Sequence, residues 1–151
     1  MSGEVLFINE EFFKRMIPSV RSIDDSQVVA AIRLVQKTNL LEIISEPVYN
    51  YLQTIFADDD DFSAGEQRLF NHIQSFLAVK VAHELTMSAP LRDNQIRDEA
   101  SKVYNDKATM LEGMIIRDIN NDSALLSLAQ SSNVETWYND DADNNGGFYF
   151  A

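Results

Sequence analysis

The scarcity of helix-breaking residues is the feature that most constrains the fold of this chain. Its 151 residues include five glycines and three prolines, and two of the glycines lie near the C-terminus. So few breakers in the body of the chain favour long helices over many short strands. The run from Val5 to Ile8 is the only short stretch with a β-like pattern ahead of the first predicted helix. We therefore predict an all-α fold, a helical bundle with a short extended segment at its N-terminus.

Two long amphipathic helices are predicted in the second half of the chain. Ser63 and Glu66 form a capping box, which marks the start of the first helix. Apolar residues at helical spacing continue from there to Leu85, over about 25 residues, and Pro90 ends or kinks the helix. The second helix ends near Ile119. Its predicted apolar stripe comprises Ile96, Ala100, Val103, Met110 and Met114, with Leu111 and Ile115 beside the last two.

Shorter helices are predicted around this pair, over residues 10–17, 25–44, 46–57 and 123–130. We expect every leucine, isoleucine, methionine and phenylalanine of the helices to pack in the core. Residues 1–130 then form one helical domain, and residues 131–151, which lack a helical period, form an extended arm outside it. The predicted N-caps of the first three short helices are Asn9, Asp24 or Asp25, and Ser45.

The chain contains no recognisable catalytic motif. It has no cysteine, which excludes disulfides and thiol chemistry, and it has neither a phosphate-binding glycine loop nor a nucleophile elbow. His83 and Glu84 begin like a zinc-protease helix, but Met87 stands where the second histidine is needed. His72 lies ~16 Å from His83 along the helix axis, too far for both to bind one metal ion. We predict that the protein is not an enzyme and needs no cofactor.

Charge and hydropathy argue against two classes of partner. A net charge of −12, with basic residues scattered along the chain, disfavours direct binding to nucleic acid. No run of ~18 apolar residues occurs, so we expect no membrane-spanning helix. The first residues also lack the basic start and the long apolar stretch of a secretory signal.

The segment near the C-terminus matches the first half of a calcium-binding loop. Asp141, Asp143 and Asn145, followed by Gly146, have the required spacing. Such a loop needs a bidentate glutamate at its twelfth position, which would be residue 152, and the chain ends at 151. Asp141, Asp143 and Asn145 are therefore an incomplete set of metal ligands. They carry the alternative hypothesis of a soluble helical protein that responds to calcium.

Aromatic residues are concentrated in the same arm. Five of the fifteen aromatic side chains lie in the last fifteen positions. Disordered tails are usually poor in aromatics, and aromatic anchors are enriched at protein interfaces. We therefore expect the arm to dock on a partner or on a neighbouring subunit. The predicted partner-binding residues are Trp137, Tyr138, Phe148, Tyr149 and Phe150.

The first half of the chain resembles a known family. Residues 31–36, which read AIRLVQ, and residues 48–52, which read VYNYL, are similar to two segments of the helical head–tail connector proteins of tailed bacteriophages. These proteins are also called adaptors or neck ring proteins. The order of the elements is similar too, with a short opening element, two shorter helices and a longer helix pair. The family often has a Leu-Gly turn where this chain has Ser45, Glu46 and Pro47.

The resemblance implies a structural virion protein that works by association. It implies a homo-oligomeric ring of about twelve subunits, a dodecamer whose neighbours make contacts that close on themselves. The ring would dock beneath the portal protein, contact neighbouring neck or tail proteins, and let DNA pass through its channel without binding it. Assembly would take place in the host cytoplasm, and the final location would be the neck of the virion. The aromatic arm would then grip the ring above or below.

Overall fold

Helices make up all the regular structure in the part of the chain that is described. The computed structural model describes residues 4–17, 23–58, 61–88 and 94–130, and no strand occurs within these ranges. The predicted all-α class is confirmed. Residues 4–9 precede the first helix without forming a strand, and residues 123–130 are helical. The other helices are α1 (Glu10–Met16), α2 (Asp25–Lys37), α3 (Asn39–Ile43), α4 (Glu46–Ala57), α5 (Ala64–Ser88) and α6 (Asn94–Asn120).

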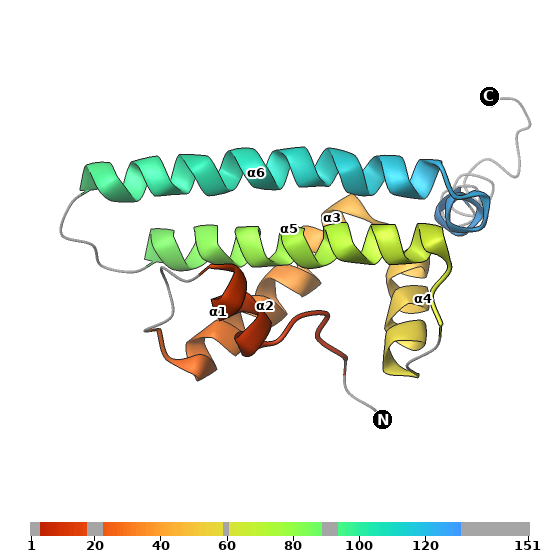
Figure 1. Cartoon of the computed structure of the whole chain (residues 1–151), viewed down its shortest axis with the longest axis horizontal. Coiled ribbons are helices and arrows are strands. Elements are labelled where there is room, and N and C mark those ends of the chain that lie inside the picture. The colour runs from red at the N-terminus through yellow and green to blue at the C-terminus, as the bar shows by residue number, and fades with distance from the viewer. Residues whose placement is uncertain (1–3, 18–22, 59–60, 89–93, 131–151) are drawn as a thin grey trace, which may run out of the picture.

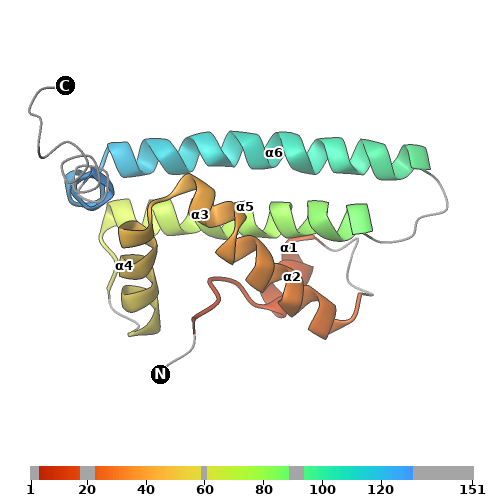
Figure 2. The ribbon, with the colours of Figure 1, turned by 180° about the vertical axis from the view of Figure 1, so that it is seen from behind.

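Helix α5 lies between two layers of the molecule. Helix α6 runs antiparallel beside α5 along nearly its whole length, and α1, α2 and α4 lie on the opposite side of α5 (Figures 1 and 2). The N-terminal segment passes between α1 and α4 in this second layer. Helix α3 belongs to neither layer alone, because it contacts both α2 and α6. This arrangement leaves the side of α6 that faces away from α5 without a covering helix in either view.

Local capping explains where several helices begin. The side chain of Asn9 accepts a hydrogen bond from the backbone N–H of Phe12 at 2.7 Å, and Asp24 caps α2. The predicted capping box is present, because the Ser63 N–H donates to Glu66 Oε1 at 2.9 Å and the Glu66 N–H donates to Ser63 Oγ at 3.1 Å. These reciprocal bonds satisfy donors that a helix start would otherwise leave unpaired.

The Glu66 carboxylate also ties α4 to α5. It accepts a hydrogen bond from the hydroxyl of Tyr51 on α4. Partial burial raises the pKa of Glu66, but the hydrogen bonds from Tyr51 and Ser63 outweigh it, so the pKa lies below its ordinary value of 4.5. The ionised carboxylate is therefore the form that the folded protein stabilises.

The predicted helix from residue 25 to 44 is in fact two helices. Thr38 separates them, and its hydroxyl donates to the backbone carbonyl of Leu34 at 2.7 Å. Such back-bonding by threonine bends helices, which accounts for the change of direction between α2 and α3. Ser45 occupies the N-cap position of α4 as predicted, but its side chain makes no capping hydrogen bond.

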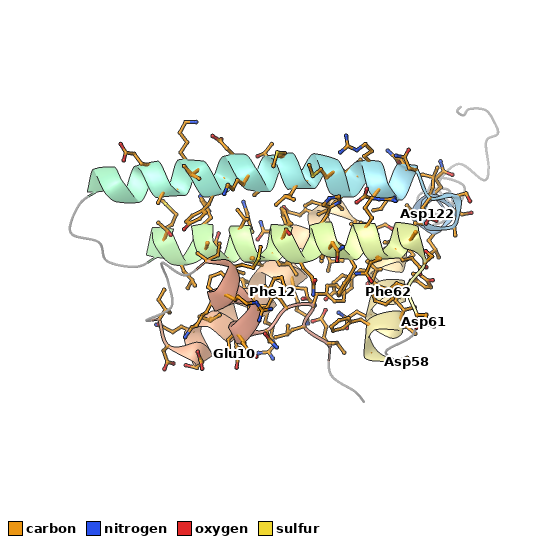
Figure 3. The ribbon with its side chains drawn as sticks, viewed as in Figure 1. Glu10, Phe12, Asp58, Asp61, Phe62 and Asp122 are labelled. Atoms are coloured by element: carbon orange, nitrogen blue, oxygen red, sulfur yellow. The ribbon has the colours of Figure 1, made fainter. Side chains whose placement is uncertain are left out.

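A second junction lies where α6 ends beside the start of α5 (Figure 3). The Asp122 carboxylate accepts from the backbone N–H groups of Ala124 and Leu125, at 3.1 and 3.2 Å, and so caps the helix over residues 123–130. A methyl group on Gly65 would lie 2.5 Å from the other Asp122 oxygen. The absence of a side chain at Gly65 therefore lets the capping carboxylate sit against α5.

Candidate functional site

Three glutamines from three helices hold the N-terminal segment through its backbone. Gln53 of α4 accepts from the Val5 N–H at 2.7 Å and donates to the Val5 carbonyl at 2.6 Å. Gln36 of α2 donates to the same carbonyl and accepts from the Phe7 N–H, both at 2.8 Å. Gln74 of α5 donates to the Phe7 carbonyl at 2.9 Å. We call Gln36, Gln53 and Gln74 the glutamine clamp.

The glutamine clamp forms hydrogen bonds with the backbone groups along one edge of an extended segment. In an extended strand the N–H and C=O groups of residues i and i+2 point to the same side, and those of Val5 and Phe7 are the groups that the clamp pairs. Buried backbone groups need such partners, because leaving one unpaired costs about 1–3 kcal/mol. The clamp therefore does for this segment what a neighbouring strand would do in a sheet.

The side chain of Phe7 fixes the segment from the other direction. Its ring makes edge-to-face contacts with Tyr49, Phe56 and Phe70, at centroid distances of 5.8, 5.7 and 5.3 Å. The hydroxyl of Tyr49 accepts from Gln36 at 3.0 Å and donates to the carboxylate of Glu4. Burial, together with the bond to Glu4, raises the pKa of Tyr49, which keeps the hydroxyl protonated. Polar and aromatic contacts thus converge on the same few residues.

A hollow of about 340 Å³ opens beside this segment, between the segment, α1 and α4. We call it the N-terminal hollow. Its volume falls within the roughly 300–1,000 Å³ range of ligand pockets. Of the described residues that line it, Arg15 alone is charged, and its guanidinium lies 5.7 Å from the centre of the Phe12 ring. The apolar lining consists of Leu6, Phe7, Ile8, Phe12 and Phe56.

Helix α6 carries a second apolar stripe that the described residues cover only in part. Val103 and Met110 are seven residues apart, hence on one face, and are 52% and 55% exposed. Met114, one turn further on the same face, is partly buried. We call Val103, Met110 and Met114 the outer stripe. The buried face consists of Ala108, Leu111, Ile115 and Ile119.

Val103 and Met110 correct the prediction that the apolar residues of this helix pack in the core, whereas Met114 does pack against the core. Helix α6 is rotated so that its buried face meets α5, and Val103 and Met110 therefore point away from it. The side chain of Ile96 lies outside the described residues. The general expectation of buried large apolar residues also fails elsewhere: the exposed ones are Met16, Leu34, Met87 and Ile116.

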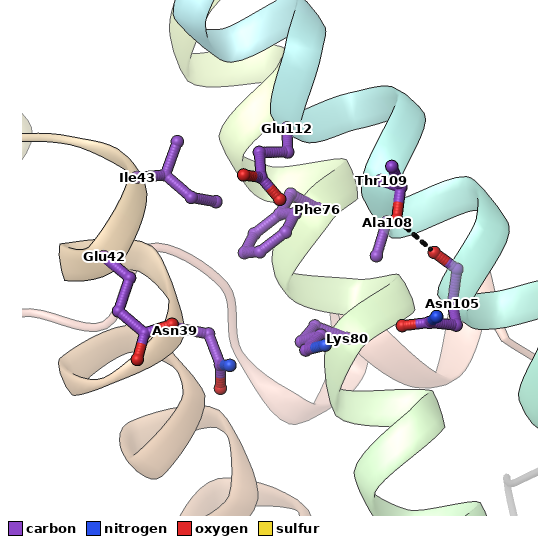
Figure 4. Close-up of a pocket in the computed structure, with 9 residues that line it drawn as sticks. All are labelled: Asn39, Glu42, Ile43, Phe76, Lys80, Asn105, Ala108, Thr109 and Glu112. Atoms are coloured by element: carbon purple, nitrogen blue, oxygen red, sulfur yellow. Dashed lines mark hydrogen bonds between the residues drawn. The ribbon is translucent and has the colours of Figure 1, made fainter.

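A smaller polar hollow of about 100 Å³ lies where α3 meets the α5–α6 pair (Figure 4). Its charged side chains are Glu42, Lys80 and Glu112. The hydroxyl of Thr109 is turned toward its own helix, where it donates to the Asn105 carbonyl at 3.0 Å. This volume is below the usual range of ligand pockets. Within the described ranges, no three His, Asp or Glu side chains are arranged to hold a metal ion.

The two histidines have different roles. His72 is half-buried, and its Nδ1 atom lies 2.5 Å from Oδ2 of the buried Asp118. This pair joins α5 to α6. The sequence signal for the pair of His72 and Asp118 is the position of Asp118, an acidic residue on the buried side of α6. The Nδ1 atom of His83 is buried and finds no partner among the described residues, and burial lowers the pKa of that ring.

The predicted interface and metal residues lie outside the part of the chain that the structure describes. These are Trp137, Tyr138, Phe148, Tyr149 and Phe150 for the interface, and Asp141, Asp143 and Asn145 for the metal. The glutamine clamp, the N-terminal hollow and the outer stripe are the features that sequence reasoning did not find.

Comparisons with known proteins found no similar chain. No protein-family model, curated protein or solved structure matches this sequence or its fold. None of the described helices combines the length and the apolar character needed to cross a membrane.

Proposed function

We propose that this protein is a non-enzymatic assembly protein that forms or joins a ring, and specifically a head–tail connector of a tailed bacteriophage. In this role about twelve copies form a ring beneath the portal protein, contact neighbouring neck or tail proteins, and surround the passing DNA. The observation that carries the proposal is the outer stripe of α6, since an exposed apolar row on an otherwise complete helical pair is typical of a protein interface.

The packing of α6 supports association rather than chance exposure. A helix that packs on one neighbour needs one apolar stripe and carries polar residues on the opposite face. Helix α6 has its covered stripe at Leu111 and Ile115, yet Val103 and Met110 add a second one. Burying the exposed half of one such side chain stabilises an assembly by about 1 kcal/mol. Gly113 adds room on the same surface, because a methyl group there would meet no atom within 4 Å.

The overall charge fits a channel through which DNA moves. The chain carries a net charge of −12, and about twelve copies in a ring would multiply it. DNA carries one phosphate charge per ~1.7 Å of helix axis, so an acidic channel repels it and a basic one would hold it. The resemblance of residues 31–36 and 48–52 to connector proteins leads to the same function.

Electron microscopy tests the proposal directly. The full chain is imaged alone and after mixing with the portal protein encoded by the same genome. We expect rings, or an added ring on the portal, and we expect the double variant Val103→Ser with Met110→Ser to lose them. A double variant at exposed polar positions of the same helix, Thr109→Ser with Asn120→Ser, is the matched control.

Two results would refute the proposal. One is the absence of any ring, with or without portal, from protein whose helix content and melting are normal. The other is normal ring formation by the variant that lacks Val103 and Met110. Circular dichroism on all samples separates lost assembly from lost folding.

A further inference from the structure

The N-terminal hollow is preformed, and its lining is mostly apolar, with Asn9, Arg15 and Gln74 as the polar residues. Its floor, Phe7 and Ile8, is 1% and 3% exposed. The Phe7 N–H donates to Gln36, and the Phe7 carbonyl accepts from Gln74. Both backbone groups of Phe7 are therefore paired and do not need a water molecule as a partner. Its half-buried apolar walls, Leu6, Phe12 and Phe56, are separated by an open space of about 340 Å³. A space with such walls favours an apolar or aromatic guest over water.

The rim of the hollow adds a charge preference. Arg15 is exposed and forms no ion pair with any described residue, while its guanidinium lies 5.7 Å from the centre of the Phe12 ring. An arginine in this position can stack with a second aromatic ring and at the same time attract a carboxylate. The adjacent Lys14 does not compete for a guest, because it is bound to Asp25 at 2.5 Å and to the Ile23 carbonyl at 2.7 Å. The fitting occupant is therefore aromatic and acidic.

The arm of this chain has that composition. Residues 131–151 contain Glu135 and three aspartates, no lysine or arginine, and the run Phe148, Tyr149 and Phe150. Such a segment is repelled by most of an acidic protein and attracted to an isolated cation. Seventeen residues, 131–147, separate the last described helix from Phe148. Fully extended, they span up to roughly 55–60 Å, which is enough to reach an adjacent molecule.

The proposed ring makes the arm of a neighbouring copy, rather than that of the same copy, the occupant to which this inference commits. Residues 123–130 follow the end of α6 and lie where α6 ends beside the start of α5 (Figures 1 and 2). The N-terminal hollow is built by the N-terminal segment, α1 and α4 on the other side of α5. The arm therefore follows a helix at that end of the molecule, whereas the hollow that would receive it lies among α1, α4 and the N-terminal segment. Repeated between copies, such a contact is heterologous, and it forms a ring when the rotation between copies closes, as the proposed function requires.

We propose that the N-terminal hollow receives the aromatic run Phe148–Phe150 of a neighbouring copy, with Arg15 facing the acidic residues of that arm. This inference rests on the proposed ring and specifies one of its contacts. It also assigns a purpose to the glutamine clamp, which keeps the floor of the receiving site in place before the arm arrives.

Photo-crosslinking of the full chain tests this docking. Tyr149 is replaced by the photoreactive residue p-benzoyl-phenylalanine, and the protein is prepared in ¹⁴N and ¹⁵N forms that are mixed before illumination. We expect crosslinks from position 149 to the peptides that contain Phe12 or Phe56, in pairs of mixed isotope. Losing and reversing one exposed charge contact corresponds to about a fivefold weaker association, so the Arg15→Glu variant should crosslink about fivefold less. Arg33→Glu, at an exposed position of α2 that does not line the hollow, is the matched control.

Three outcomes overturn the docking. They are crosslinks confined to pairs of a single isotope, crosslinks that avoid α1 and α4, and equal yields from the Arg15→Glu and Arg33→Glu variants. Micrographs of the same samples separate the two proposals. Rings without crosslinks at the hollow refute only this inference, whereas the absence of rings with or without portal refutes the proposed function.

Discussion

Replacing Gln36 with leucine should destabilise the protein far more than an ordinary polar-to-apolar change in a helix. Gln36 is fully buried and bonds three groups: the Phe7 N–H, the Val5 carbonyl and the Tyr49 hydroxyl. After the change, the Val5 carbonyl keeps its bond from Gln53, and the Tyr49 hydroxyl keeps its bond to the Glu4 carboxylate. The Phe7 N–H keeps no partner. The largest single contribution to the loss of stability therefore comes from the Phe7 N–H, a buried donor left without a partner.

The expected loss is about 2–4 kcal/mol in the free energy of unfolding. An unpaired buried donor contributes about 1–3 kcal/mol of it, and each of the other lost hydrogen bonds contributes about 0.5–1.5 kcal/mol. Leucine recovers part of this through its apolar surface, which is why we do not expect the full sum. With a urea m-value of about 2 kcal/mol per M, the unfolding midpoint should fall by about 1–2 M.

Urea unfolding followed by circular dichroism measures this loss. Gln27→Leu is the control, because Gln27 is exposed on the same helix and its change should stay within about 0.5 kcal/mol. The double variant Gln36→Leu with Gln53→Leu should lose more than the sum of the single variants, since both side chains bond the Val5 carbonyl. A loss below 0.5 kcal/mol for Gln36→Leu, with the Phe7 amide still protected from hydrogen exchange, would refute the reasoning (a threshold of about the size of a surface substitution).

Three further predictions concern other parts of the molecule. Gly113→Ala should raise the free energy of unfolding by about 0.5–1 kcal/mol, the usual helix gain, whereas Gly65→Ala should gain nothing in the same melts because its methyl group displaces the Asp122 cap. The pKa of Glu66 is lower in the folded chain than its ordinary value of 4.5, so its contribution to stability is present above pH ~4.5 and is lost as the pH falls below it; Glu66→Gln should therefore flatten the loss of stability on the acid side of pH ~4.5, and an unchanged pH profile would contradict this. Deleting residues 134–151 should leave the circular dichroism spectrum nearly unchanged but abolish attachment to the partner ring in sedimentation, and unfolding of the truncated chain would show instead that the arm packs on its own body.

The helix positions could be predicted from the sequence because the signals that set them are local. The capping box at Ser63 and Glu66 and the cap at Asn9 each involve residues three apart in the chain, and the structure has both. The break at Thr38 is local too, but a threonine within an apolar helical pattern is compatible with either a bent or a straight helix. The amphipathic pattern alone therefore predicted one helix where α2 and α3 are two.

The rotation of α6 could not be predicted, because periodicity identifies an apolar face without identifying what covers it. Two apolar stripes on one helix share the same spacing, and only packing against α5 distinguishes Leu111 and Ile115 from Val103 and Met110. The glutamine clamp could not be predicted either. Nothing in the sequence around a glutamine indicates that its partner is a backbone group 29, 48 or 67 residues away. The aromatic arm remains a prediction from composition.

The glutamine clamp has a consequence for the order in which the protein forms during synthesis. Val5 and Phe7 leave the ribosome before their partners, which follow 29 to 67 residues later. At about 5–20 residues per second, the segment waits some seconds for Gln74 to emerge. Contacts this distant along the chain form late and slow the folding of a domain. Val5 and Phe7 are thus made before all of their partners but are fixed late, and a newly made chain exposes Phe7 until α5 is complete.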